Sequence, residues 1–195
     1  MNMFIYIIGK GNQMRKKDDK LRETLLDMAH NIAETEGIDK INIRTIAKKT
    51  GIASGTVYNY FSNKDDILLA LTEEYWKQTL SEMKEIIKSN SFCDQIQEVF
   101  IFLKQKIDCS GGKLMNSLNN VETAGQKRMA SVQLELKTFL IQLIEKDPNI
   151  DKEIWNKNFI KERFIEFIML NMMALLKTKE PDIDFLIIVI NRMIY

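Results

Sequence analysis

The chain has 195 residues, of which 45% are hydrophobic and 28% are charged, and its formal net charge is +1. This balance supports a sizeable hydrophobic core and excludes a polycation. The charge is unevenly distributed: residues 1–64 carry 11 Lys and Arg against 7 Asp and Glu, whereas the remainder carries 17 against 20. A mildly basic N-terminal part on an acidic body is typical of a protein that presents one end to phosphates.

The cysteine and histidine content argues against metal and disulfide chemistry. Cys93 and Cys109 are the only cysteines and have no CxxC spacing, and His30 is the only histidine. We therefore expect neither a structural zinc site nor a disulfide framework, and both cysteines fit a reducing cytosol. The sequence predicts a cytoplasmic protein that needs no cofactor.

The scarcity of helix-breaking residues predicts an all-α protein. Two prolines and eight glycines in 195 residues leave few interruptions. No alternating run of β-branched residues indicates a sheet. Long helices are therefore expected throughout.

Residues 1–14 differ in character from the rest of the chain. Their apolar run, residues 3–8, is far shorter than the ~20 residues of a membrane span, so no membrane association is expected. Met14 is followed by Arg15 and Lys16 and would be a natural start. Residues 1–14 are thus interpreted as an N-terminal extension or a mis-start.

The first predicted helix covers about residues 18–36. Leu21, Leu25, Met28 and Ile32 follow the spacing i, i+4, i+7, i+11, which gives one apolar stripe. Gly37 ends the helix, because glycine adopts the left-handed conformation of a helix C-terminus without strain.

Two short helices joined by a tight turn are predicted next. Asn42 is suited to cap the first of them. Ile43, Ile46 and Ala47 follow the spacing i, i+3, i+4, which gives one apolar face, and Gly51 ends the helix. This is the layout of a helix-turn-helix, whose second helix lies in the DNA major groove.

The second helix of this motif has a polar outward face, and Gly55 on it permits close backbone approach. The alternative is a solvated face on an ordinary helical hairpin. Two aromatic and two β-branched residues give this segment a low intrinsic helix propensity. A plain solvated helix therefore does not explain its composition, whereas DNA binding does. The residues of this face are Ser54, Thr56, Tyr58, Asn59 and Tyr60.

The motif resembles the TetR family of bacterial transcriptional regulators. The resemblance covers about residues 20–72 and is densest over residues 45–68, with Thr-Gly-Ile-Ala-Ser-Gly-Thr-Val-Tyr-Asn-Tyr-Phe at the centre. It implies an all-α fold with a three-helix DNA-binding head, residues 15–64, and a helical ligand-binding and dimerisation body, residues 65–195.

The resemblance also implies which residues contact double-stranded operator DNA. Arg44 would reach a base edge, plausibly guanine, while Tyr58 and Lys64 would fix the head on the backbone. Many relatives carry histidine where this chain has Tyr60, which leaves that contact open. The full expected set is Asn42, Arg44, Thr45, Ser54, Gly55, Thr56, Tyr58, Asn59, Tyr60 and Lys64.

A long helix from about Lys64 through Ile87 is expected to join head and body, with Ser62 as its cap and Asp65 completing a capping box. Amphipathic helices are predicted over residues 92–108, 122–146, 151–178 and 182–193, with a short one over 114–119.

The helices predicted over residues 151–178 and 182–193 are apolar nearly all round, which requires burial on more than one side. Glu162, Arg163 and Glu166 interrupt the first apolar run, and the second is shorter than ten residues, so neither spans a membrane. We expect a homodimer interface built from both, as in the family's four-helix bundle.

The family resemblance implies an effector cavity in the body, and its apolar character favours a small hydrophobic effector. The alternative for each candidate is ordinary core, which is the more frequent role of aromatic residues at helical spacing. The candidates are Trp76, Phe100, Met115, Phe139, Trp155, Phe159 and Phe164.

The sequence discriminates between three classes of function. The sequence favours a ligand-responsive transcriptional regulator, most simply a repressor, that binds palindromic operator DNA as a homodimer. The alternative is a DNA-binding regulator without a small ligand, controlled by a protein partner. A single histidine and the lack of a Gly-rich phosphate loop argue against an enzyme.

Overall fold

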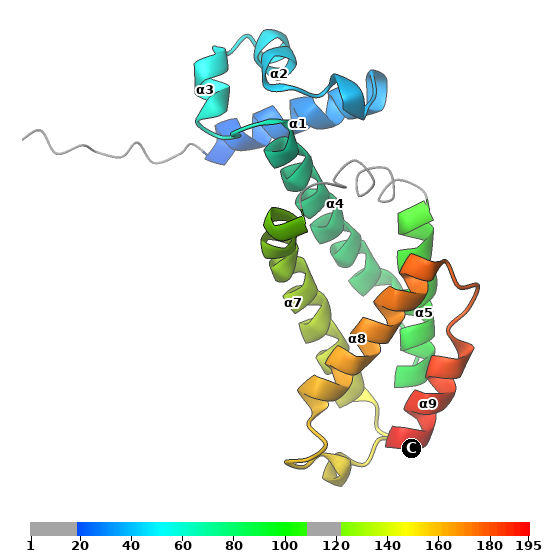
Figure 1. The fold of residues 1–195 in the computed structure, drawn as a ribbon. Helices are drawn as coiled ribbons and strands as arrows, with labels where there is room; N and C mark the ends of the chain where they lie inside the picture. Colours follow the sequence, from blue (N-terminus) through cyan, green and yellow to red (C-terminus); the bar gives the residue numbers. More distant parts are fainter. Residues whose placement is uncertain (1–18, 109–121) are drawn as a thin grey trace, which may run out of the picture.

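The computed structural model describes residues 19–108 and 122–195, with side chains given for α7 from Met129 onward. Within these ranges every regular element is helical, as predicted (Figure 1). The elements are α1 (Asp19–Thr35), α2 (Ile43–Thr50), α3 (Ser54–Tyr58), α4 (Lys64–Ile86), α5 (Phe92–Lys106), α7 (Glu122–Lys146), α8 (Lys161–Thr178) and α9 (Asp184–Ile194), with short 3₁₀ turns at Ile38–Lys40 and Lys152–Ile154. The proposed extension, residues 1–14, and Met115 lie outside the described residues.

The helices enclose two separate hydrophobic cores. The head core joins α1, α2 and α3 to the first turns of α4. Leu25, Ile32, Ile46 and Val57 are completely buried in it. The body core gathers side chains from the rest of α4 and from α5, α7, α8 and α9. The division into a head and a body follows from these two clusters.

Helix α4 belongs to both cores. Ile67, Leu68 and Leu71 are buried in the head core, whereas Leu80 and Met83 are buried in the body core. These groups lie on one unbroken helix of 23 residues. A displacement of its body half must therefore also displace the residues that it packs into the head core.

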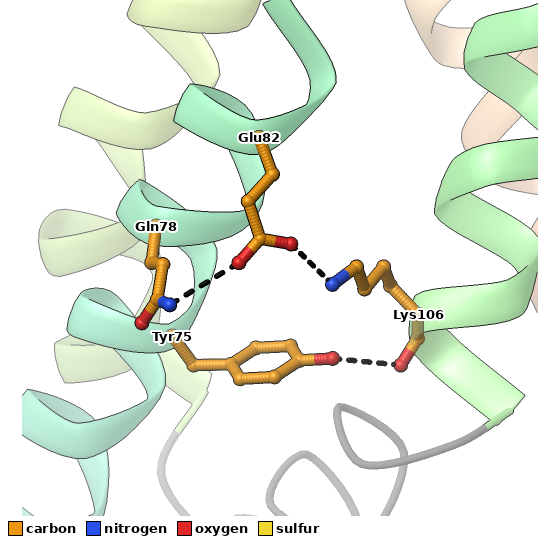
Figure 2. Close-up of polar contacts among 4 residues, drawn as sticks. All are labelled: Tyr75, Gln78, Glu82 and Lys106. Atoms are coloured by element: carbon orange, nitrogen blue, oxygen red, sulfur yellow. Dashed lines mark hydrogen bonds and ion pairs between the residues drawn. The ribbon is translucent and has the colours of Figure 1, made fainter. Parts of the chain in front are cut away.

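Polar side chains also fasten α4 to the end of α5 (Figure 2). Tyr75 donates its hydroxyl to the carbonyl oxygen of Lys106 at 3.0 Å, and the Lys106 amine donates to Glu82 at 2.5 Å. The hydrogen bond from Lys106 holds the pKa of Glu82 below its ordinary value. Gln78 donates to the other Glu82 oxygen at 3.1 Å, which fixes the carboxylate. This cluster sets the rotation of α4 relative to α5.

The structure corrects the predicted start of α4. Its N-cap is Asn63 rather than Ser62, and the Asn63 side chain accepts from the Asp66 backbone N–H at 2.9 Å. The Asp66 carboxylate in turn accepts from the Ser62 backbone N–H at 2.9 Å. The reciprocal capping pattern is therefore present, displaced by one residue from the prediction.

The predicted helix over residues 151–178 was also wrong in its first third. Asp151 caps only the short Lys152–Ile154 turn. Asn156 then accepts from the backbone N–H groups of Asn158 and Phe159, at 2.9 and 3.2 Å. This local turn competes with helix formation, so α8 begins at Lys161.

The lower end of the body is held by a buried carboxylate. Asp147, 3% exposed, accepts from the Tyr195 hydroxyl and from the Phe92 N–H at 2.7 Å, and so joins α5, α7 and α9. Asn149 donates its backbone N–H to the same carboxylate at 2.9 Å. Burial opposes ionisation of Asp147, but these donors outweigh it and lower the pKa of the carboxyl.

None of the helices in the described part of the chain combines the length and apolar character needed to cross a bilayer.

Replacing Asp147 should destabilise the body. Asp147→Ala leaves the Asn149 N–H without its acceptor and the Phe92 N–H with only the longer contact to the Tyr195 hydroxyl, which should cost ~1–3 kcal/mol in the free energy of unfolding. Tyr195→Phe should cost less, because the Phe92 and Asn149 N–H groups keep the Asp147 carboxylate as acceptor. Chemical denaturation monitored by circular dichroism measures both, and equal stability of Asp147→Ala and the wild type would contradict this role.

The same carboxylate predicts a pH dependence. Because the folded-state pKa of Asp147 lies below the ordinary value of 3.8, its contribution is complete above pH 3.8 and is lost as the pH falls through the folded-state value. The stability difference between wild type and Asp147→Ala should therefore shrink below about pH 4. A difference that stays constant down to pH 2 would contradict the assignment.

The corrected helix cap can be tested separately. Asn63→Ala should lower stability by ~1 kcal/mol, because the Asp66 N–H loses its acceptor. Ser62→Ala should have little effect, because Ser62 contributes only its backbone N–H to this cap. If Ser62→Ala lowers the thermal unfolding midpoint more than Asn63→Ala does, Ser62 is the cap, as predicted from the sequence.

Candidate nucleic-acid interface

Helix α2 is defined by its two ends, as the sequence predicts. The Asn42 side chain accepts from the Thr45 N–H at 2.9 Å, which caps the first turn. Gly51 has φ 70° and ψ 17°, the left-handed conformation in which a side chain would be strained. Its N–H donates to Ala47, and the Ile52 N–H donates to the same carbonyl at 3.0 Å. The turn therefore redirects the chain directly into α3.

Helix α3 has only five residues and no side-chain cap at its N-terminus. A helix this short is not stable alone. It is held by Val57, which is completely buried against the α2 residues Ile46 and Ala47 in the head core. Tertiary packing therefore fixes the helix and turns its remaining side chains outward.

The predicted contact residues differ in how far they are exposed. Arg44 on α2 is exposed, as are Gly55, Tyr58 and Asn59 on or next to α3. Thr45, Ser54, Thr56 and Tyr60 are half-buried, and Tyr60 packs against the head core. Together they form one continuous corner of the head, and no acidic residue lies on α3 itself.

Gly55 has no packing reason of its own to be glycine. A Cβ atom built at this position meets nothing within 4 Å. The space above the α3 backbone is therefore open to another molecule.

Two predicted contact residues already have partners within the protein. Asn42 uses its side-chain oxygen for the cap and donates its amide to the Lys40 carbonyl at 3.2 Å. The Lys64 amine donates to the Asp39 carbonyl at 3.2 Å and lies 4.0 Å from the Asp39 carboxylate. A phosphate at Lys64 would have to share this amine with the Ile38–Lys40 turn.

The sequence interpretation overlooked Lys48. It is exposed on α2 and lies four residues after Arg44, hence on the same side of the helix. That spacing was the signal that could have found it. Lys49 differs, because its amine pairs with Glu36 of α1.

The aromatic residues predicted to line an effector cavity fall into two groups. Trp76, Phe100, Phe139 and Phe164 are buried in the body core. Among the residues that the structure describes, the buried indole N–H of Trp76 has no hydrogen-bond partner.

The second group is a half-exposed aromatic cluster at the start of α8. Trp155 stacks on Phe159 with ring centroids 5.1 Å apart, and Phe164 joins them at 5.3 Å from Phe159. Phe164 therefore belongs to both groups and joins the half-buried Trp155 and Phe159 to the body core.

Comparison with known proteins identifies the head. Residues 25–71 match the family described as bacterial regulatory proteins, tetR family. The fatty acid metabolism regulator protein of Bacillus subtilis is 31% identical over 144 residues, which are 73% of this chain and 66% of that protein. An HTH-type transcriptional regulator of Staphylococcus aureus is 30% identical over 73 residues, only 40% of its length. The aligned part therefore spans less than the whole of these relatives.

Solved structures agree with the fold. The fatty acid degradation regulator FadR from Bacillus halodurans matches with a TM-score of 0.55 and 17% identity, over 91% of this chain and 96% of that one. At this identity the likeness concerns the fold alone. With the helix-turn-helix geometry and the family match to residues 25–71, these findings lead to one conclusion: the chain belongs to the TetR family of bacterial regulatory proteins.

Proposed function

We propose that this protein is a homodimeric transcriptional regulator that binds palindromic operator DNA through α2 and α3 and is released by a small hydrophobic effector. The observation that carries the proposal is the exposed, non-acidic face of α3, a helix that depends on its packing in the head core. A short helix with its polar face free is the arrangement required of a recognition helix in the major groove.

The proposed contacts divide into base readers and backbone clamps. Arg44, at the start of α2, is proposed to read a guanine edge, since a guanidinium can donate two hydrogen bonds to its O6 and N7 atoms. Asn59 and the half-buried hydroxyl residues of α2 and α3 are proposed to face bases or nearby phosphates. Tyr58, Lys64 and Lys48 are proposed to hold the DNA backbone.

Dimerisation is proposed to occur through α8 and α9. Their outer side exposes large apolar residues that the body core does not cover: Phe167, Leu170, Met173, Phe185, Ile188 and Met193. A contiguous apolar face of this size marks an interaction surface. A symmetric dimer would present two heads to successive major grooves ~34 Å apart, which explains why a palindrome is proposed.

The effector is proposed to be a long-chain acyl compound. The fatty acid metabolism regulator among the relatives supports this class. So does a solved FadR from Bacillus subtilis in complex with stearoyl-CoA, which matches with a TM-score of 0.51 and 19% identity over 88% of this chain and 94% of that one. Within this body the buried Trp76 indole N–H lacks an acceptor. An acyl carbonyl oxygen would supply one and remove the cost of an unpaired buried donor.

The proposed route from effector to DNA is α4. Trp76 lies on α4 one turn after Thr72, near the point where the helix leaves the head core for the body core. A ligand that moves Trp76 moves the same helix that supports α1 and α3. Repression without ligand and release with ligand follow from this coupling.

Substitutions in the head should separate base reading from backbone binding. Arg44→Ala should weaken operator binding by ~1–3 kcal/mol and reduce the preference for operator over unrelated DNA. Lys64→Ala should weaken binding to both DNAs similarly and lower the salt dependence. Gel shifts on DNA flanking the gene, at several salt concentrations, measure both effects. An Arg44→Ala protein with unchanged sequence preference would remove that residue from the proposal.

The effector class can be tested with stearoyl-CoA. It should raise the thermal unfolding midpoint of the protein and reduce operator binding, because it binds the folded body. Trp76→Phe should diminish both effects, whereas Trp155→Phe, the matched substitution of the other tryptophan, should keep them. If stearoyl-CoA changes neither the midpoint nor DNA binding, the acyl effector is refuted and control by a protein partner becomes the better account.

A further inference from the structure

We propose that the dimer is built by a reciprocal insertion in which Phe185 of each subunit enters the aromatic groove at the start of α8 of the other subunit. Arg163, on the rim of that groove, then faces the partner's Glu180 and the partner's Asp182. The inference rests on the proposed homodimer and specifies its register. It assigns part of the aromatic cluster to subunit recognition rather than to effector binding.

Phe185 is a large apolar side chain that its own subunit leaves exposed to solvent. It is 79% exposed in the first turn of α9, although its neighbours Leu186 and Ile190 are buried in the body core. Leaving an aromatic side chain in water forfeits one of the largest available hydrophobic contributions. Its truncation would remove few contacts within one subunit.

A groove of matching character lies at the opposite end of the same face. It encloses about 180 Å³, and its wall is largely aromatic and aliphatic. The lining residues are Asn158, Phe159, Ile160, Arg163, Phe164, Phe167 and Met193.

The groove is preformed. The stacked Trp155 and Phe159 rings support one wall from behind. Reciprocal backbone hydrogen bonds of 3.1 Å between Asn156 and Phe159 fix the loop that carries them. Little ordering is therefore needed when a side chain enters.

One subunit cannot fill its own groove with Phe185. The groove lies where α8 begins and α9 ends, whereas Phe185 lies where α8 ends and α9 begins. Phe185 lies eight residues before the groove residue Met193 on α9, which is roughly 12 Å along the helix and beyond the reach of its side chain. A second copy is the occupant that carries the complementary group.

A two-fold axis near the middle of α8 brings the two ends together. An axis perpendicular to α8 at this point reverses the direction of α8 in the partner, so the end of one helix lies beside the start of the other. Leu170, 74% exposed at the midpoint of α8, would then contact its own copy. Having both the projecting residue and the groove on one face makes that face self-complementary, as an isologous interface requires.

The charges at the two ends fit this register. Near the groove, Lys161 pairs with Glu145 at 2.7 Å and the Glu166 carboxylate pairs with Lys137 at 2.6 Å, both on α7. Arg163, unlike these two residues, is one of the residues that line the groove.

At the other end of the face, Glu180 and Asp182 line the hollow between α8 and α9 beside Phe185. Lys179 instead lines a separate hollow with Lys104 of α5. The antiparallel register therefore places a basic rim opposite an acidic one.

The first test measures the dimer dissociation constant by sedimentation equilibrium. Phe185→Ala should raise this constant by at least about tenfold, as expected for an aromatic anchor that fills a pocket of the partner. Leu134→Ala is the matched control, because Leu134 is 64% exposed on α7, a helix that lines neither the groove nor the hollow beside Phe185. Equal constants for Phe185→Ala and wild type would overturn the insertion, whereas a monomeric wild type would overturn the homodimer itself.

The second test is a disulfide between subunits. In a Cys109→Ser background, Ile160→Cys combined with Phe185→Cys should form a covalent dimer under mild oxidation, because the two positions meet only across subunits. Each single variant should form much less. A dimeric protein that gives no cross-link from the pair would overturn the register while leaving the proposed function intact. Loss of the cross-link when stearoyl-CoA is added to an intact dimer would assign the groove to the ligand and likewise contradict the proposal.

Discussion

The structure depends on one constraint, the continuity of α4 through two hydrophobic cores. Its first turns bury Ile67, Leu68 and Leu71 among the helices of the head, and its later turns bury Leu80 and Met83 among those of the body. Because the helix is unbroken over 23 residues, neither core can shift it without straining the other. The Arg22 guanidinium adds a surface tie, at 3.8 Å from Glu74 of α4.

This constraint joins the proposed activities. The recognition helix α3 is too short to hold itself and takes its orientation from the head core, of which α4 is a part. At the body end, Tyr75 and Glu82 fasten α4 to Lys106 of α5 (Figure 2). The proposed ligand in the body would compete with packing and with these hydrogen bonds, and α4 would transmit the resulting displacement to the head. The proposed dimer face would convert a movement of each head into a change in the spacing between two heads.

Sequence reasoning predicted the head well because its signals are local. The cap at Asn42, the left-handed Gly51 and the apolar spacing of α2 are decided by residues within a few positions of one another. It failed where alternatives of similar energy compete, as at Ser62 and Asn63, or where side chains such as Asn156 form a turn within an apolar helical pattern. The aromatic residues of the body could not be sorted from sequence, because both core and groove require apolar side chains. Only the packing separates buried Phe100 and Phe139 from the half-exposed Trp155 and Phe159.

If α4 couples the body to the spacing of the heads, the distance between the two heads of the proposed dimer must change with the ligand. A spin label at Asn31→Cys, exposed on α1 and outside the proposed DNA contacts, in a Cys109→Ser background reports this distance by pulsed electron resonance. Coupling through α4 predicts one narrow distance distribution in the operator complex and a shifted distribution when stearoyl-CoA is bound. A distribution that is identical with operator, with stearoyl-CoA and with neither would contradict the coupling.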